Sequence, residues 1–137
     1  MTLKWEGEKL TRKLRRAEAR GIDATMAAAV VHAKGNHGPG AHGKQRFESG
    51  SKAASGSANL ERSMRITRPA RRSGNTTAGR WGSQGIVYAR RIELGFQGKD
   101  SAGRIVDAPA YPFLRPAAES EYPKLAGRIR RGLKRAL

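Results

Sequence analysis

The apolar residues near the start of the chain follow two different helical stripes. Residues 2–20 carry the first stripe, which consists of Leu3, Leu10, Leu14 and Ala17. Residues 22–34 carry the second stripe, which consists of Ile22, Met26, Ala29, Val30 and Ala33. At about 100° per residue, the second stripe is rotated by roughly 130° from the first. Either the helix breaks at Gly21, where the change occurs, or one long helix presents its two halves to different surfaces.

The rest of the sequence offers little apolar material to cover both stripes. The 137 residues are enough for one domain, spanning 1–137, and only 37% of them are hydrophobic. We therefore expect a thin core. Cysteine is absent, which excludes disulfides and thiolate metal sites and is typical of a reducing interior. No apolar run is long enough for a membrane span or a signal peptide, so we expect a soluble, unsecreted protein.

The charge balance points to an anionic partner. The chain has 28 Lys and Arg residues against 11 Asp and Glu, which gives a net charge of +17. Self-repulsion of this size destabilises an isolated compact chain. The composition favours nucleic acid as the partner, but a membrane surface or an acidic neighbouring subunit fits the same imbalance.

Residues 35–59 are rich in Gly, Ser and Ala, which is the composition of a flexible loop. A loop of this length is either disordered or ordered only by a partner. His32, His37 and His42 recur at intervals of five residues in and beside it. No carboxylate or thiolate accompanies them, and a Gly-rich backbone would not hold them in place. We interpret them as solvated loop histidines and predict no metal site.

The middle of the chain has residue patterns that are typical of short strands. Asn59 is a candidate cap for a helical turn, and residues 64–68, "MRITR", alternate apolar and basic side chains as in a half-buried strand. Residues 86–88, "IVY", form a β-favouring run. Residues 104–113 contain prolines that push the preceding residues into extended conformations. Turn chemistry occurs at 71–79 and 97–104.

The end of the chain predicts an amphipathic helix. Pro116 suits the first position of a helix, with Glu119 near the positive end of its dipole. Pro123 either breaks that helix after one turn or begins a second one. Beyond it, one side of the helical wheel is apolar and consists of Leu125, Ala126, Ile129, Leu133, Ala136 and Leu137. The other side is basic, and we expect it to make electrostatic contacts through Lys124, Arg128, Arg130, Arg131, Lys134 and Arg135. The predicted fold class is α+β, with a long or broken N-terminal helix, a small antiparallel sheet of two to four strands and this C-terminal helix.

Catalytic motifs are missing from the sequence. It contains no cysteine nucleophile, no G-x-S-x-G, no P-loop and no H-E-x-x-H. Glu93 is a carboxylate flanked by apolar residues, and we expect it to form a salt bridge with Arg90 or Arg91. We therefore predict that the protein is not an enzyme.

Three motifs follow one another in a recognisable order. Gly56, Leu60 and Ser63 stand in "SGSANLERS"; Tyr88, Ala89, Glu93 and Gly95 stand in "YARRIELG"; and Pro112, Phe113, Leu114, Pro116 and Ala117 stand in "PFLRPA". Together they resemble the neck or minor tail-component family of long-tailed bacteriophages, which are head–tail joining and tail completion proteins. The correspondence spans nearly the whole chain.

The resemblance implies a structural α+β subunit of a ring between the capsid connector and the tail tube, either a neck protein or a tail terminator. It implies a virion location, reached through the host cytoplasm, and neither catalysis nor a cofactor. The implied partners are copies of the same chain and the adjacent head-completion and tail-tube proteins. Genome DNA in the channel is a further non-specific contact, and no membrane is involved.

Five residues are the expected core or interface anchors: Tyr88, Glu93, Tyr111, Phe113 and Leu114. Phe113 and Leu114 are expected to fill the subunit core, with the neighbouring prolines fixing their approach. The alternative hypothesis, which rests on the charge alone, is a free basic nucleic-acid-binding module.

Overall fold

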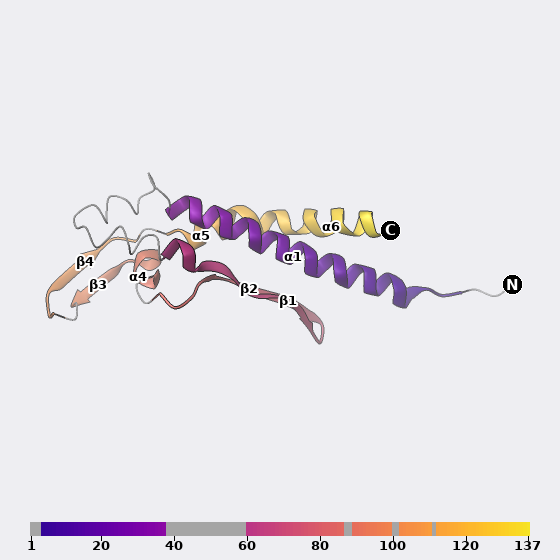
Figure 1. Cartoon of the computed structure of the whole chain (residues 1–137), viewed down its shortest axis with the longest axis horizontal. Coiled ribbons are helices and arrows are strands. Elements are labelled where there is room, and N and C mark those ends of the chain that lie inside the picture. The colour runs from indigo at the N-terminus through magenta and orange to yellow at the C-terminus, as the bar shows by residue number, and fades with distance from the viewer. Residues whose placement is uncertain (1–3, 38–59, 87–88, 100–101, 111) are drawn as a thin grey trace.

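The computed structural model describes residues 4–37, 60–86, 89–99, 102–110 and 112–137 (Figure 1). Its elements, in chain order, are α1 (Gly7–His37), β1 (Met64–Ser73), β2 (Thr76–Ser83), α4 (Ala89–Leu94), β3 (Phe96–Lys99), β4 (Ile105–Ala108), α5 (Leu114–Glu121), the 3-10 turn η1 (Tyr122–Lys124) and α6 (Leu125–Ala136). The predicted α+β class is confirmed. No helix in the described ranges combines the length and apolarity needed to cross a bilayer.

The long helix α1 is the spine of the molecule. It lies between α6 on one side and the β1–β2 hairpin on the other, and it also contacts α5 (Figure 1). It continues to His37, so residues 35–37 are helical and do not belong to the predicted loop. The rest of that loop, residues 38–59, lies outside the described residues, as do Asn59 and His42.

Gly21 does not break α1; it allows α6 to approach. A Cβ atom at this position would lie 2.5 Å from Cγ1 of Ile129 and 3.2 Å from the Ile129 backbone nitrogen. Further along the same contact, the backbone of Gly132 lies against Ala17. The rotation between the two stripes therefore reflects one helix with two partner surfaces.

The β1–β2 hairpin is longer than the sequence suggested. Its strands are antiparallel, and the pairing of Ser73 with Thr76 leaves a two-residue turn. Gly74 has a φ of 57° in this turn, a backbone conformation that residues with a side chain rarely adopt. The ladder shifts register around Pro69, as expected for a proline within a strand. The N–H of Ala70 next to it donates instead to Asp23 Oδ1 of α1, at 2.7 Å.

The second sheet is a separate short hairpin of β3 and β4. The β-favouring run at 86–88 does not form a strand at Ile86, and residues 87–88 lie outside the described part. The helix α4 begins at Ala89 directly afterwards, because Ala89 and Ile92 lie three positions apart and both are buried in the core.

The core is thin, as the composition indicated. Its contiguous cluster consists of Ala33, Leu60, Met64, Ala89, Ile92, Phe113 and Ala117, and the largest fully buried side chains are Phe113, Leu60 and Met64. Residues 60–63 form the predicted helical turn. The cluster lies where the C-terminal part of α1 meets α4 and α5.

The two prolines of the C-terminal region define three consecutive helical pieces. α5 begins at Leu114, so Pro116 is its third residue and not its first. A proline is tolerated there because the first four helical N–H groups have no partner within the helix. Pro123 lies in η1, between α5 and α6. It therefore ends the first helix after two turns and precedes the second.

Candidate functional site

The most distinctive local geometry is the carboxylate of Glu93 at the start of α5. Glu93 Oε2 accepts the backbone N–H groups of Phe113 and Leu114, at 2.7 and 2.9 Å, and Oε1 accepts that of Arg115 at 2.9 Å. No side-chain cap comes from Phe113, the N-cap residue itself. The three bonds satisfy donors that a helix N-terminus leaves free, and the negative charge sits at the positive end of the helix dipole. Glu93 therefore joins α4 to α5.

Other contacts surround this junction. Leu60 is fully buried beside Phe113 in the core cluster. Asn36, near the end of α1, donates through Nδ2 to the Phe113 carbonyl at 3.2 Å. The Ser63 hydroxyl lies 2.6 Å from the Ser83 hydroxyl, which ties the turn before β1 to the end of β2. We call the set Asn36, Leu60, Ile92, Glu93 and Phe113 the joint.

Of the predicted core or interface anchors, some are buried in the core cluster and others lie outside the described residues. Phe113 is 1% exposed and Leu114 packs partly buried against the same cluster. Tyr88 and Tyr111 lie outside the described residues. The expected salt bridge of Glu93 does not form, because its carboxylate is directed at the α5 backbone.

The two arginines predicted to pair with Glu93 lie elsewhere. Arg91 lies over the Phe96 ring, 4.2 Å from its centroid. Arg90 is exposed.

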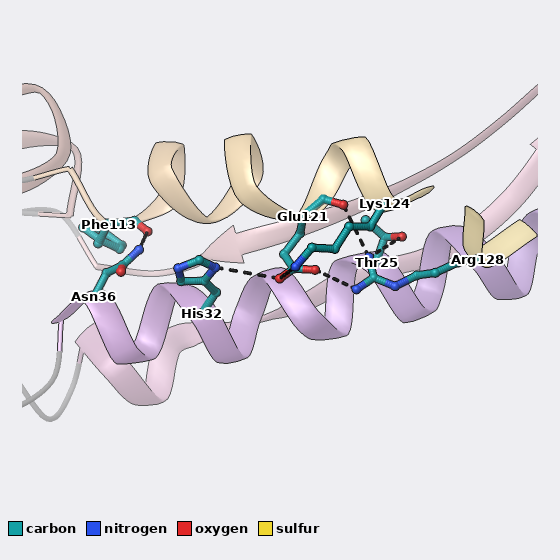
Figure 2. A network of polar contacts seen from close by, with 7 residues as sticks. All are labelled: Thr25, His32, Asn36, Phe113, Glu121, Lys124 and Arg128. Carbon is teal, nitrogen blue, oxygen red and sulfur yellow. Dashed lines mark hydrogen bonds and ion pairs between the residues drawn. The ribbon is translucent and has the colours of Figure 1, made fainter. Parts of the chain in front are cut away.

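A second polar cluster is centred on Glu121, the last residue of α5 (Figure 2). Its carboxylate contacts Arg128 Nη2 at 2.6 Å, Lys124 Nζ at 3.1 Å and His32 Nδ1 at 3.8 Å. Arg128 also donates to the buried Thr25 hydroxyl at 3.2 Å. The hydrogen bonds from Arg128 and Lys124 hold the pKa of Glu121 below its ordinary value. The cluster fastens the start of α6 to α1.

The contacts of Glu121 separate the six basic residues predicted to face a partner into two that are paired within the protein and four that are not. Arg128 points inward with its side chain 18% exposed, and Lys124 shares its acid, so neither is a free surface charge. Glu121, which precedes the basic run, was not among the predicted contacts. Four residues stay exposed and have no ion-pair partner in the described part of the chain: Arg130, Arg131, Lys134 and Arg135.

The histidines also differ from the prediction. His32 is not a loop residue, because it lies within α1 and faces Glu121. His42 and the side chain of His37 lie outside the described residues. Among the residues that are described, no three His, Cys, Asp or Glu side chains gather as a metal site would need.

The β1–β2 hairpin carries a basic surface that the sequence reading did not single out. Arg68 stands directly opposite Arg80 in the register, and Arg65 and Arg71 are also exposed. Like charges placed directly opposite each other destabilise a strand pair. A shallow cleft of about 440 Å³ lies beside them, next to Trp81 and Gln84. The alternating pattern of "MRITRPARR" was the available signal.

The N-terminal half of α1 leaves apolar side chains uncovered. Leu10 is 51% exposed and Leu14 is 46% exposed, whereas Ala17 of the same stripe is buried. Trp5, just before the helix, is also exposed. Among the described residues of the first stripe, Ala17 is buried and Leu10 and Leu14 are not covered by the described part of the chain.

No protein-family model, no curated protein and no solved structure significantly matches this chain.

Proposed function

We propose that the protein is a structural subunit of a bacteriophage head–tail junction, where copies form a ring between the capsid connector and the tail tube. The observation that carries this proposal is the joint. Each of the three sequence motifs behind the resemblance contributes one residue to it: Leu60 and Phe113 are buried in one core cluster, and Glu93 accepts N–H groups at the start of α5. These three residues, which lie far apart in the chain, thus serve one structural unit.

The uncovered stripe of α1 supports an assembly. Leu10 and Leu14 lie on the same helical face as the buried Ala17, so a second surface of matching shape would extend the existing contact. Subunit interfaces are the usual cover for a helix face of this kind. We infer that a neighbouring copy in the ring packs on this part of α1.

The proposal is tested by deleting the gene from the phage that carries it. We expect DNA-filled heads and separate tails to accumulate without joined particles, as seen by negative-stain electron microscopy. Supplying the wild-type chain from a plasmid should restore infectious particles. Normal joined virions in the deletion strain would contradict the proposal.

A free nucleic-acid-binding module is the second candidate function. It is favoured by the facing pair Arg68 and Arg80, whose repulsion an anionic ligand would relieve. In this case the isolated monomer would bind duplex DNA tightly, with a steep dependence on salt. Binding no stronger than that of a generic polycation of equal charge would remove this candidate.

A further inference from the structure

A second cleft lies between α1 and α6, on a different surface from the joint. Its volume is about 410 Å³. Its floor is made by small residues, including Ala17, Gly21 and Gly132, which also let the two helices approach closely. Its walls carry four arginines: Arg20 from α1, and Arg128, Arg131 and Arg135 from α6.

The charge of this cleft is largely uncompensated. Arg128 is held by Glu121 and Thr25, which fixes the position of its guanidinium group. Arg20, Arg131 and Arg135 are exposed and have no ion-pair partner within the described ranges. No acidic residue lines the cleft. The acids of the facing stretch of α1 turn to the hairpin instead, where Glu18 contacts Arg72 at 3.3 Å.

We propose that this cleft binds the phosphate backbone of duplex DNA. Guanidinium groups match phosphate oxygens with paired, charge-assisted hydrogen bonds. Ala24 and Ala136, which also line the cleft, are exposed, so a sugar-phosphate strand meets only small side chains between the arginines. The inference rests on the proposed function for its setting, since it names the surface by which a ring subunit touches the genome.

The lining of the cleft argues for backbone contact and against base reading. It consists only of Ala, Gly and Arg, so it has no aromatic ring on which an unpaired base would stack. It also lacks the Asn, Gln or acidic side chains that read adenine or cytosine edges, and arginine, the one lining side chain that reads a base edge, would select only guanine. Binding should therefore depend strongly on salt and little on sequence.

An acidic protein partner could pair with the same arginines, so DNA and acidic protein are separated by the poly-aspartate arm of the test below. A membrane is disfavoured by the position of α6. A membrane surface would need the apolar side of α6, but Ile129 and Leu133 on that side are half-buried against the rest of the protein.

The test is fluorescence anisotropy of a labelled 30-base-pair DNA duplex with the full-length protein, over a series of salt concentrations. The cleft variant combines Arg20→Gln, Arg131→Gln and Arg135→Gln. The matched control combines Arg62→Gln, Arg90→Gln and Lys99→Gln, which removes the same charge at exposed positions that line no part of this cleft. Thermal unfolding should show both variants folded, because none of the six side chains packs in the core.

We expect the cleft variant to bind at least tenfold more weakly near physiological salt, and its slope of log affinity against log salt to fall by about 2.5 to 3. The control should change the slope by less than about 1. Equal losses in both variants would overturn the proposal, because they would indicate binding by net charge alone. The proposal would also be overturned if the cleft variant lost binding to an RNA duplex or to poly-aspartate but bound DNA as tightly as the wild-type protein does.

The outcome is separable from that of the proposed function. The anisotropy measurement uses the free chain, whereas head–tail joining is scored in particles. If the cleft variant loses DNA binding but the deletion strain still joins heads to tails, the ring proposal is contradicted and the proposed DNA site is supported.

Discussion

The two ends of α1 use their charges in opposite ways. At the C-terminal end lies the joint, where the Glu93 carboxylate accepts hydrogen bonds from three backbone N–H groups and large side chains are buried. At the N-terminal end lie α6 and the tip of the β1–β2 hairpin (Figure 1), with exposed arginines and half-exposed leucines. In the described part of the chain, the polar and apolar groups of the joint pair with one another, whereas Leu10 and Leu14 are uncovered and Arg131 and Arg135 have no ion-pair partner. We infer that the joint maintains the fold and the opposite end meets the partners.

The largest expected effect is at the joint. Replacing Phe113 by Ala removes the largest fully buried side chain and should lower the free energy of unfolding by about 3–5 kcal/mol. Urea denaturation followed by circular dichroism measures this loss. The matched change at the other end, Leu10→Ala, removes a half-exposed side chain and should cost less than about 1 kcal/mol. Similar costs at both positions would remove the distinction between the two ends.

The second prediction concerns the carboxylate of Glu93. Glu93→Gln keeps the shape but loses the negative charge at the start of α5, so we expect a loss of about 1–2 kcal/mol in the free energy of unfolding. Glu61→Gln is the control, because Glu61 has no hydrogen bond or ion pair in the described part of the chain. An unchanged stability of the Glu93 variant would mean that its three bonds contribute nothing net.

The third prediction uses two glycines of the same helix. Gly21→Ala should destabilise the protein by about 1 kcal/mol, because the new methyl group meets Ile129 and the clash exceeds the gain in helix propensity. Gly35→Ala meets nothing within 4 Å and should stabilise it by about 0.5–1 kcal/mol. Differential scanning calorimetry gives both shifts, and a stabilising Gly21→Ala would contradict the close approach of α1 and α6.

The smallest expected effect is on pH dependence. The ordinary pKa of Glu121 is 4.5, and the fold lowers it. A lowered pKa means that the stabilisation is complete above the ordinary value and is lost as the pH falls below it toward the folded-state value. Urea titrations between about pH 6 and pH 3 should therefore show a steeper loss of stability in the wild-type protein than in Glu121→Gln. Parallel curves would show that the cluster around Glu121 does not titrate with folding.

Much of the fold was accessible from the sequence because helical periodicity is a local signal. The second stripe of α1 and the amphipathic α6 were predicted from spacing alone, and turn residues indicated the hairpins. Ile86, the described residue of the β-favouring run 86–88, lies outside any strand, and α4 begins at Ala89 and buries Ile92 in the core. Long-range packing of this kind has no local signature.

The site was less accessible than the fold. The bonds of Glu93 join residues 20 to 22 positions apart, and its partners are backbone groups that carry no sequence signal. The inward turn of Arg128 depends on Glu121 seven positions earlier and on Thr25 in another helix. Helical-wheel reasoning assigns a residue to a face but does not reveal what lies across from that face.

The central claim is that this chain is a ring subunit at the head–tail junction. Cryo-electron microscopy of purified virions carrying a tagged version of the chain tests it most directly. We expect a closed ring of this fold between the capsid connector and the tail tube, with the C-terminal half of α1 inside each subunit and its N-terminal half at the contact between neighbours. Absence of the tagged chain from the neck and tail of the particles would contradict it.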